Sequence, residues 1–142
     1  MVLVDVNSVE AELEHAQDPF PQDVEFMISA LEAGPRPICD RHKLKRTPYR
    51  VRAALRLFSD GPGMPPWLLY TRNVTSRALG FLTPQCLPLS HGGVLSIVSP
   101  KGGKVMQISC TILRCREAVL GWYEGAVYFN RPQMCFDAEY MS

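Results

Sequence analysis

The sequence predicts a mainly β protein, built as an antiparallel barrel or sandwich. From residue 51 onward, short segments alternate apolar and polar residues, the pattern of strands with one buried face. Turn sequences rich in glycine and proline separate these segments, and no helical pattern lies between them. The chain has 142 residues, of which 46% are hydrophobic, enough to form the core of one packed domain.

Six segments carry the strand pattern. In the first, residues 51–58, Val51, Ala53 and Leu55 share an apolar face, and most of the other face is arginine. The five segments that follow are residues 67–75, 79–83, 94–98, 104–115 and 122–130. Loops with several prolines or glycines join them, such as 60–66 and 84–93.

The last two strand segments also predict which side chains face inward. In 104–115, simple alternation places Cys110 and Cys115 on opposite faces, so the two thiols are not expected to pair. In 122–130, the expected core residues are Tyr123, Val127 and Phe129.

Two helices are expected before the strands. Asn7 can cap the first, with Glu10 at the capping-box position, and prolines 19 and 21 interrupt it. The second, 21–33, has its apolar residues at helical spacing: Val24, Met27, Ile28 and Leu31. We expect this stripe to pack on the core, with a second chain or a partner protein as the alternative. A short helix is also expected near residues 133–140.

Charge is distributed unevenly along the chain. Residues 1–35 hold eight acidic and no basic side chains, a charge of −8, and residues 36–56 hold eight bases against one acid, a charge of +7. The remaining residues add +2, which gives the net charge of +1. We therefore divide the chain into an acidic helical extension (1–35), a basic linker (36–50), the β domain (51–131) and a tail (132–142). A basic block suits an anionic ligand, a partner or the acidic segment itself, although solvated surface charge is the commoner explanation.

Several functional classes lack support in the sequence. No apolar run is long enough to span a membrane and no signal peptide is recognisable, so a cytoplasmic location is expected. The five cysteines are scattered, which predicts free thiols, and the lone pair Cys39 and His42 does not complete a metal site. No nucleotide-cofactor or catalytic motif is present, so we expect neither a cofactor nor enzymatic activity.

Two short segments combine side chains suited to an anionic ligand with a base. Arg46 and Arg50 stand four residues apart at the start of the β domain, and a guanidinium binds phosphate oxygens or the guanine edge through its planar fork of donors. Asn73 and Thr75 stand two residues apart, so an amide and a hydroxyl are expected on one side of the chain. The simpler explanation for the second segment is a turn whose side chains bond their own backbone.

Together these segments resemble the PilZ domain family, whose bacterial members bind the second messenger cyclic di-GMP. The family's R-x-x-x-R motif matches Arg46 and Arg50, and its [D/N]-x-[S/T]-x-x-G motif matches Asn73, Thr75 and then Ala78 in the place of glycine. The resemblance covers roughly residues 40–131. It implies a six-stranded antiparallel split barrel beside a helix, with no catalytic activity. It also implies that the arginines bind phosphate and guanine and that Asn73 and Thr75 hydrogen-bond a guanine.

Ala78 is the departure from this family pattern. If the turn requires a positive φ or a close backbone approach, a Cβ at this position costs about 1–2 kcal/mol. The first hypothesis is therefore a cyclic di-GMP receptor that relays binding to its N-terminal segment. The alternative is a degenerate PilZ-like domain that acts through protein contacts, including self-association through helix 21–33. DNA or RNA binding is less expected, because Phe58 is the only aromatic residue on the arginine face.

Overall fold

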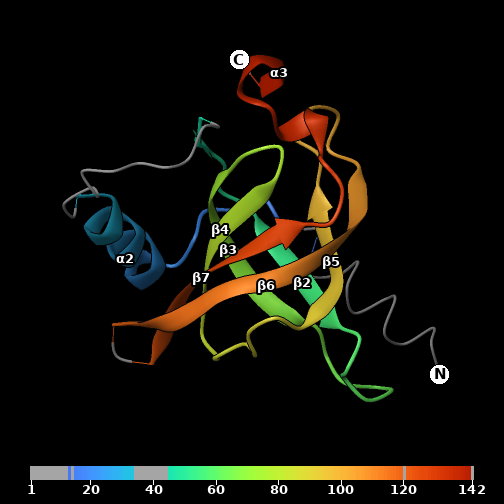
Figure 1. Cartoon of the computed structure of the whole chain (residues 1–142). Coiled ribbons are helices and arrows are strands. Elements are labelled where there is room, and N and C mark those ends of the chain that lie inside the picture. Colours follow the sequence, from blue (N-terminus) through green and yellow to red (C-terminus); the bar gives the residue numbers. More distant parts are fainter. Residues whose placement is uncertain (1–12, 14, 34–44, 120, 142) are drawn as a thin grey trace.

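The computed structural model describes residues 13, 15–33, 45–119 and 121–141, and in it the chain forms a barrel of antiparallel strands with one helix beside it (Figure 1). Its strands are β1 (Thr47–Pro48), β2 (Arg52–Leu57), β3 (Trp67–Val74), β4 (Ala78–Thr83), β5 (Gly92–Val98), β6 (Val105–Val119) and β7 (Trp122–Phe129). The helical elements are α2 (Gln22–Ala33), the 3-10 turn η1 (Met134–Phe136) and α3 (Ala138–Met141).

Six of the strands close into a ring, which confirms the predicted barrel. The order is β3-β2-β5-β6-β7-β4, and β4 pairs with β3 to complete the circle. The short strand β1 lies outside this ring, and among the described strands it pairs only with β3. Each of the six predicted segments forms one of the barrel strands, and β6 continues beyond the predicted end at residue 115 to Val119.

The barrel interior is filled by the apolar faces of the strands. Leu55, Leu69, Leu79 and Phe129 are fully buried there, as the alternation of the sequence predicts. Tyr123 departs from the prediction, since it is only partly buried and lies at the rim of an outer depression.

The described ladders contain three register shifts, and two of them change which residues face outward near the hollow. The β6–β7 register runs from Ile112↔Val127 to Arg114↔Ala126, so β6 carries one extra residue at this point. The extra residue reverses the alternation, and Cys115 therefore packs against the core on the same side as Cys110. The prediction that these two cysteines face opposite sides is wrong for this reason. Cys86, Cys110, Cys115 and Cys135 are all free thiols.

The second bulge is in β3, where the register with β4 changes between Thr71↔Phe81 and Asn73↔Gly80. Thr71 is fully buried, and Val74 is buried beyond the bulge. Between them Arg72 and Asn73 are both half-buried, so two neighbouring polar side chains lie at the barrel surface.

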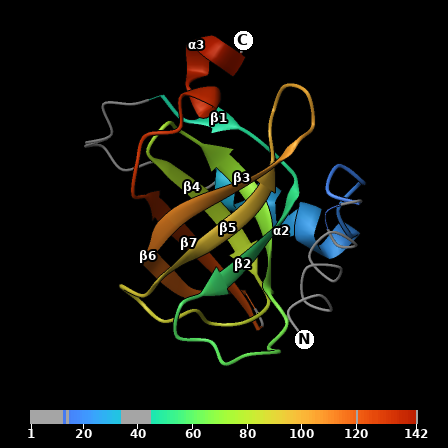
Figure 2. The ribbon, with the colours of Figure 1, turned by 90° about the vertical axis from the view of Figure 1, so that its right-hand side faces the viewer.

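Helix α2 packs on the outside of the barrel, beside β3, β4 and β7 (Figures 1 and 2). Its buried residues Val24, Met27 and Ile28 join Tyr70 and Leu82 in a second apolar cluster, separate from the barrel interior. This confirms the expected stripe and its packing on the core of the same chain. Among the described helices, none has both the length and the apolar character that crossing a bilayer would need.

Arg52 holds the segment before α2 against the barrel. Its Nη1 donates to the carbonyl of Asp18 at 2.9 Å, and its Nη2 donates to the carbonyl of Pro19 at 3.1 Å. The same guanidinium lies 5.5 Å from the ring centres of Phe20 and Tyr70. The first predicted helix begins at Asn7, and its residues 7–12 and 14 lie outside the described part of the chain.

The C-terminal tail covers the end of the barrel where β1 lies (Figure 2). Phe136, in η1, is fully buried and packs against Phe129 and Tyr49, with ring centres 5.8 Å and 5.6 Å away. The short helix expected near residues 133–140 is thus divided into η1 and α3.

Candidate functional site

The segment that carries the first motif is attached to the edge of β3. Thr47 and Pro48 form β1 and pair with Val74 and Asn73. Tyr49 then fixes the segment, because its backbone N–H donates to the carbonyl of Arg72 at 3.1 Å and its phenol donates to the carbonyl of Val98. Burial raises the pKa of Tyr49 to about 12, with a smaller contribution from Cys135, which keeps the phenol a donor. Part of the predicted linker is therefore an ordered strand.

The two arginines of the first motif lie in different surroundings. Arg46 lines a small hollow on the barrel wall. Arg50 lies at the other end of the segment and is ion-paired with α2, at 2.8 Å to Glu25 and 3.2 Å to Glu32. The motif thus connects the hollow to the acidic helix.

The second motif forms the turn between β3 and β4. The backbone N–H of Thr75 donates to the carbonyl of Ala78 at 2.9 Å. The Thr75 hydroxyl accepts the backbone N–H groups of Arg77 and Ala78, each at 3.0 Å. Thr75 therefore closes its own turn, which is the simpler of the two roles that the sequence allowed. Its single hydroxyl proton is left to donate.

Asn73 lies across from Gly80 in the β3–β4 ladder. A Cβ added at Gly80 would stand 2.8 Å from Oδ1 of Asn73, so the glycine makes room for the amide. Ala78 does not have a positive φ, and its backbone has no need of glycine. Its methyl group instead occupies the wall of the hollow, where the only cost is the space it takes from a ligand.

The hollow brings together four of the five residues that the sequence predicted for the site. It has a volume of about 40 Å³ and is lined by Arg46, Arg72, Asn73, Thr75, Ala78, Leu79, Gly80, Arg114 and Ala126. Arg50 is the predicted residue that does not line it. Both motifs therefore meet at one place on the barrel wall, although their residues are separated by more than twenty positions in the sequence.

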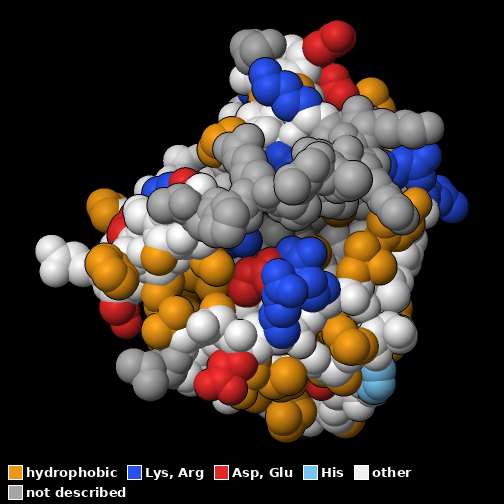
Figure 3. Space-filling view, turned by 60° about the vertical axis from the view of Figure 1, so that its left-hand side comes forward, with side chains coloured by type: hydrophobic (Ala, Val, Ile, Leu, Met, Phe, Trp, Pro, Cys, Tyr) orange, Lys and Arg blue, Asp and Glu red, His pale blue; other side chains and the backbone are white. Residues whose placement is uncertain are grey.

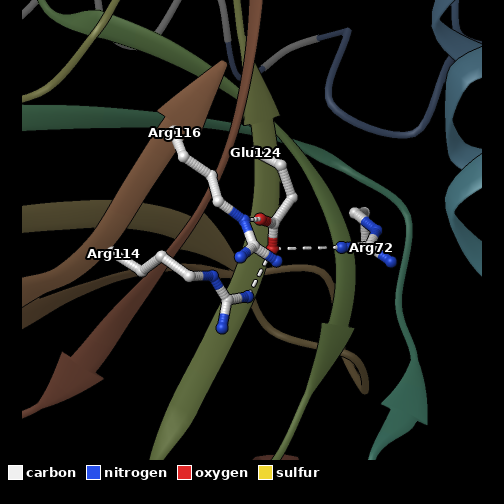
Figure 4. Close-up of polar contacts among 4 residues, drawn as sticks. All are labelled: Arg72, Arg114, Arg116 and Glu124. Carbon is white, nitrogen blue, oxygen red and sulfur yellow. Dashed lines mark hydrogen bonds and ion pairs between the residues drawn. The ribbon is translucent and has the colours of Figure 1, made fainter. Parts of the chain in front are cut away.

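Three arginines surround one glutamate next to this hollow (Figure 4). Glu124 is 5% exposed and accepts from Nη1 of Arg72 at 3.5 Å, from Nη2 of Arg114, and from Nε of Arg116 at 3.1 Å. Figure 3 shows basic side chains directly beside an acidic patch near the middle of the face that it draws. Three positive charges against one negative charge leave the group at +2.

Arg72 is the most enclosed of the three arginines, with 12% of its side chain exposed. Burial is the main cause that lowers the pKa of Arg72, and the charges of Arg114 and Arg46 lower it further. The negative charges of Glu124 and Glu32 act in the opposite direction and raise this pKa. A guanidinium nevertheless stays charged in proteins. Sequence reasoning missed Arg72, Arg114 and Glu124, because no motif marks them and the bulges that turn the arginines outward leave no clear pattern in the sequence.

A larger depression of about 720 Å³ lies at the other end of the barrel. It is lined by Met64, Pro65, Pro66, Trp67, Pro84, Gln85, Cys86, Gly121 and Tyr123. None of these side chains carries a permanent charge, and the site predicted for an anion is therefore the smaller hollow. The other motif considered, Cys39 with His42, lies outside the described residues.

No protein-family model matches this chain, and no curated protein matches its sequence. Among solved structures, the fold is similar to that of the Bacillus subtilis inhibitor of motility, MotI (DgrA), with a TM-score of 0.55 and 11% sequence identity. The similarity covers 76% of this chain and 55% of that protein, so the match spans about half of the neighbour's length. At this identity the comparison establishes the fold alone.

Proposed function

We propose that this chain is a non-enzymatic receptor domain that binds cyclic di-GMP at the hollow and relays binding through α2. The observation that carries the proposal is the meeting of both PilZ-like motifs at one place, with Arg46, Asn73, Thr75 and Ala78 around the same hollow. A cyclic dinucleotide presents two phosphates and two purine rings. Guanidinium groups suit the phosphates and guanine edges, and an amide suits a base edge.

The relay that we propose uses Arg50. Its partners Glu25 and Glu32 are 42% and 44% exposed, and exposed ion pairs contribute only about 0–1 kcal/mol each. A ligand phosphate therefore competes with them at low cost. Once Arg50 turns to the ligand, α2 loses these two contacts and keeps its apolar packing on Tyr70 and Leu82. Binding at the hollow thus changes how firmly α2 is held.

The neighbour with the similar fold is called an inhibitor of motility, and a regulatory role for this chain agrees with that name. A second candidate function is a PilZ-like domain that does not bind nucleotide and acts only through protein contacts. The small volume of the hollow, about 40 Å³, and the Ala78 methyl on its wall favour this alternative.

Titration calorimetry with cyclic di-GMP tests the proposal. We expect Arg46→Ala to weaken binding by roughly tenfold or more, because a hydrogen bond to a charged group contributes about 1.5–3 kcal/mol. Asn73→Ala should weaken it by roughly two- to tenfold, because a neutral hydrogen bond to a base contributes about 0.5–1.5 kcal/mol. Arg56→Ala is the matched control, since Arg56 lies on β2 and does not line the hollow. Absence of heat from the wild type at high micromolar ligand would reject the proposal in favour of the second candidate.

The relay has its own test. Replacing Glu25 and Glu32 together by glutamine removes the competitors for Arg50, and we expect the affinity for cyclic di-GMP to rise up to about fivefold. The same double substitution in an Arg50→Ala background should have no effect on affinity. An equal rise in both backgrounds would show that the glutamates act as general negative charge.

A further inference from the structure

The hollow extends across four strands of the barrel wall, well beyond the two motifs. Its floor follows one row of the ladder: Asn73 pairs with Gly80, Gly80 with Ala126, and Ala126 with Arg114. The two middle residues have little or no side chain, whereas the ends of the row are polar and charged. Three strand spacings of about 4.8 Å give this row a length of roughly 14 Å.

Around Glu124 the hollow carries positive charge that this carboxylate does not balance. Arg72 and Arg114 both line the hollow, and each gives one terminal nitrogen to the Glu124 carboxylate. The charge of the group remains +2 with Arg116 included. Arg46 adds to it from the β1 side. Burial is the main cause that lowers the pKa of Arg72, and the charge of Arg46 makes the smallest contribution.

Unused donors are present in the same two arginines. Among the described residues, three buried polar side-chain atoms have no hydrogen-bond partner: Thr47 Oγ1, Arg72 Nε and Arg114 Nε. Two of the three thus belong to arginines that line the hollow. A guanidinium held on one side by a carboxylate keeps the donors of its other edges for a second oxyanion.

We propose that Arg72 and Arg114, which reach Glu124 from β3 and β6 and are positioned by it, bind a phosphate group beside this carboxylate. The ligand class is a compound with two phosphates or phosphodiesters, one bound near Arg46 and the other by this pair. The inference rests on the proposed function for the identity of the nucleotide, but the phosphate pair itself depends only on the net positive charge around Glu124 and on the unused donors of Arg72 and Arg114.

Arg114 and Arg116 provide a matched pair for the test. Both lie on β6 and both bind Glu124, but Arg116 is 73% exposed and does not line the hollow. We expect Arg114→Gln to weaken cyclic di-GMP binding by roughly ten- to a hundredfold, and Arg116→Gln by less than about threefold. Arg114→Lys keeps the charge beside Glu124, so it protects the fold, yet it lacks the planar fork and should lose most of the same affinity.

A second probe separates this inference from the proposed function. Inorganic pyrophosphate is titrated into the wild type and Arg114→Lys while the backbone amide signals of Gly80 and Ala126 are followed by NMR. Saturable shifts in the wild type that are lost in the variant support the phosphate pair, even if cyclic di-GMP gives no heat. Cyclic di-GMP binding that is equally strong in Arg114→Gln and Arg116→Gln would overturn the pair and leave the proposed function standing. Failure of both probes to bind the wild type would overturn both.

Discussion

The two places where carboxylates meet arginines in this molecule differ in burial, and the difference separates a changeable contact from a fixed one. Glu25 and Glu32 are more than 40% exposed and bind Arg50 at the surface, whereas Glu124 is 5% exposed and binds three arginines. Surface ion pairs contribute about 0–1 kcal/mol and are screened by salt. Breaking a buried pair costs about 3–5 kcal/mol, because a charge is left uncompensated.

This comparison assigns different roles to arginines of the same barrel. Arg50 can exchange its partners at little cost, which suits a residue that reports whether a ligand is present. Arg72 is 12% exposed, and the carboxylate that holds both it and Arg114 is buried, which suits residues that must meet a ligand in a defined geometry. Four predictions break or sharpen this distinction, in order of expected effect.

The largest effect is expected from Glu124→Gln. It removes the one negative charge among three arginines and leaves the enclosed Arg72 without its counter-charge, so the free energy of unfolding should fall by about 3–5 kcal/mol. Urea denaturation followed by circular dichroism measures this. The control is Glu117→Gln on β6, where the side chain is exposed and a change of about 0.5 kcal/mol or less is expected. Equal effects of the two substitutions would contradict the fixed character of the Glu124 site.

The second prediction uses high pH to destabilise the barrel, while the arginines and glutamates of the two ion-pair sites keep their charges. Burial raises the pKa of the Cys110 thiol from 9.0 to about 11. Because the folded pKa is the higher one, this stabilisation is complete below pH 9 and is lost as the pH rises through 11. The free energy of unfolding should fall by roughly 1–3 kcal/mol over this range. The fall should be smaller in Cys110→Ala, and an identical pH dependence in both proteins would refute the assignment.

A third prediction concerns the floor of the hollow. Gly80→Ala places a methyl group 2.8 Å from Oδ1 of Asn73, and the amide must move because it is the far end of a side chain. The fold should lose about 1 kcal/mol or less, while ligand affinity should drop several-fold. Gly61→Ala is the control, since a Cβ at Gly61 meets nothing within 4 Å. Unchanged affinity in Gly80→Ala would show that the position of Asn73 does not matter for binding.

The smallest effect is expected at the surface pairs. Replacing Glu25 and Glu32 by glutamine should change the free energy of unfolding by less than about 1 kcal/mol, and high salt should reduce even this difference. The fluorescence of Trp122, which packs beside the helix cluster, measures the docking of α2. The substitution Trp67→Phe in the background leaves Trp122 as the one tryptophan. A fall in the free energy of unfolding as large as that expected for Glu124→Gln would remove the distinction between the two sites.

Much of the fold could be predicted because its strands and its helix depend on the spacing of apolar residues within short segments. Alternation in residues 51–58 and 104–115 predicted strands, and the spacing of Val24, Met27 and Ile28 predicted a helix with one buried face. The site was predictable in part, since Arg46 and Asn73 do meet at one hollow. The pairing of Arg50 with α2 was not predictable, because it joins residues 18 and 25 positions apart through the docking of a helix.

The sequence by itself determined the β-barrel class, the amphipathic helix and the two motifs, because each depends on spacing within a short segment. Only the tertiary structure decided which arginines surround the hollow. A single extra residue in β3 and another in β6 turn Arg72 and Arg114 outward, and the pairing of β7 with β6 brings Glu124 between them. These contacts depend on strand register across the barrel, and register is set by the packing of the whole core.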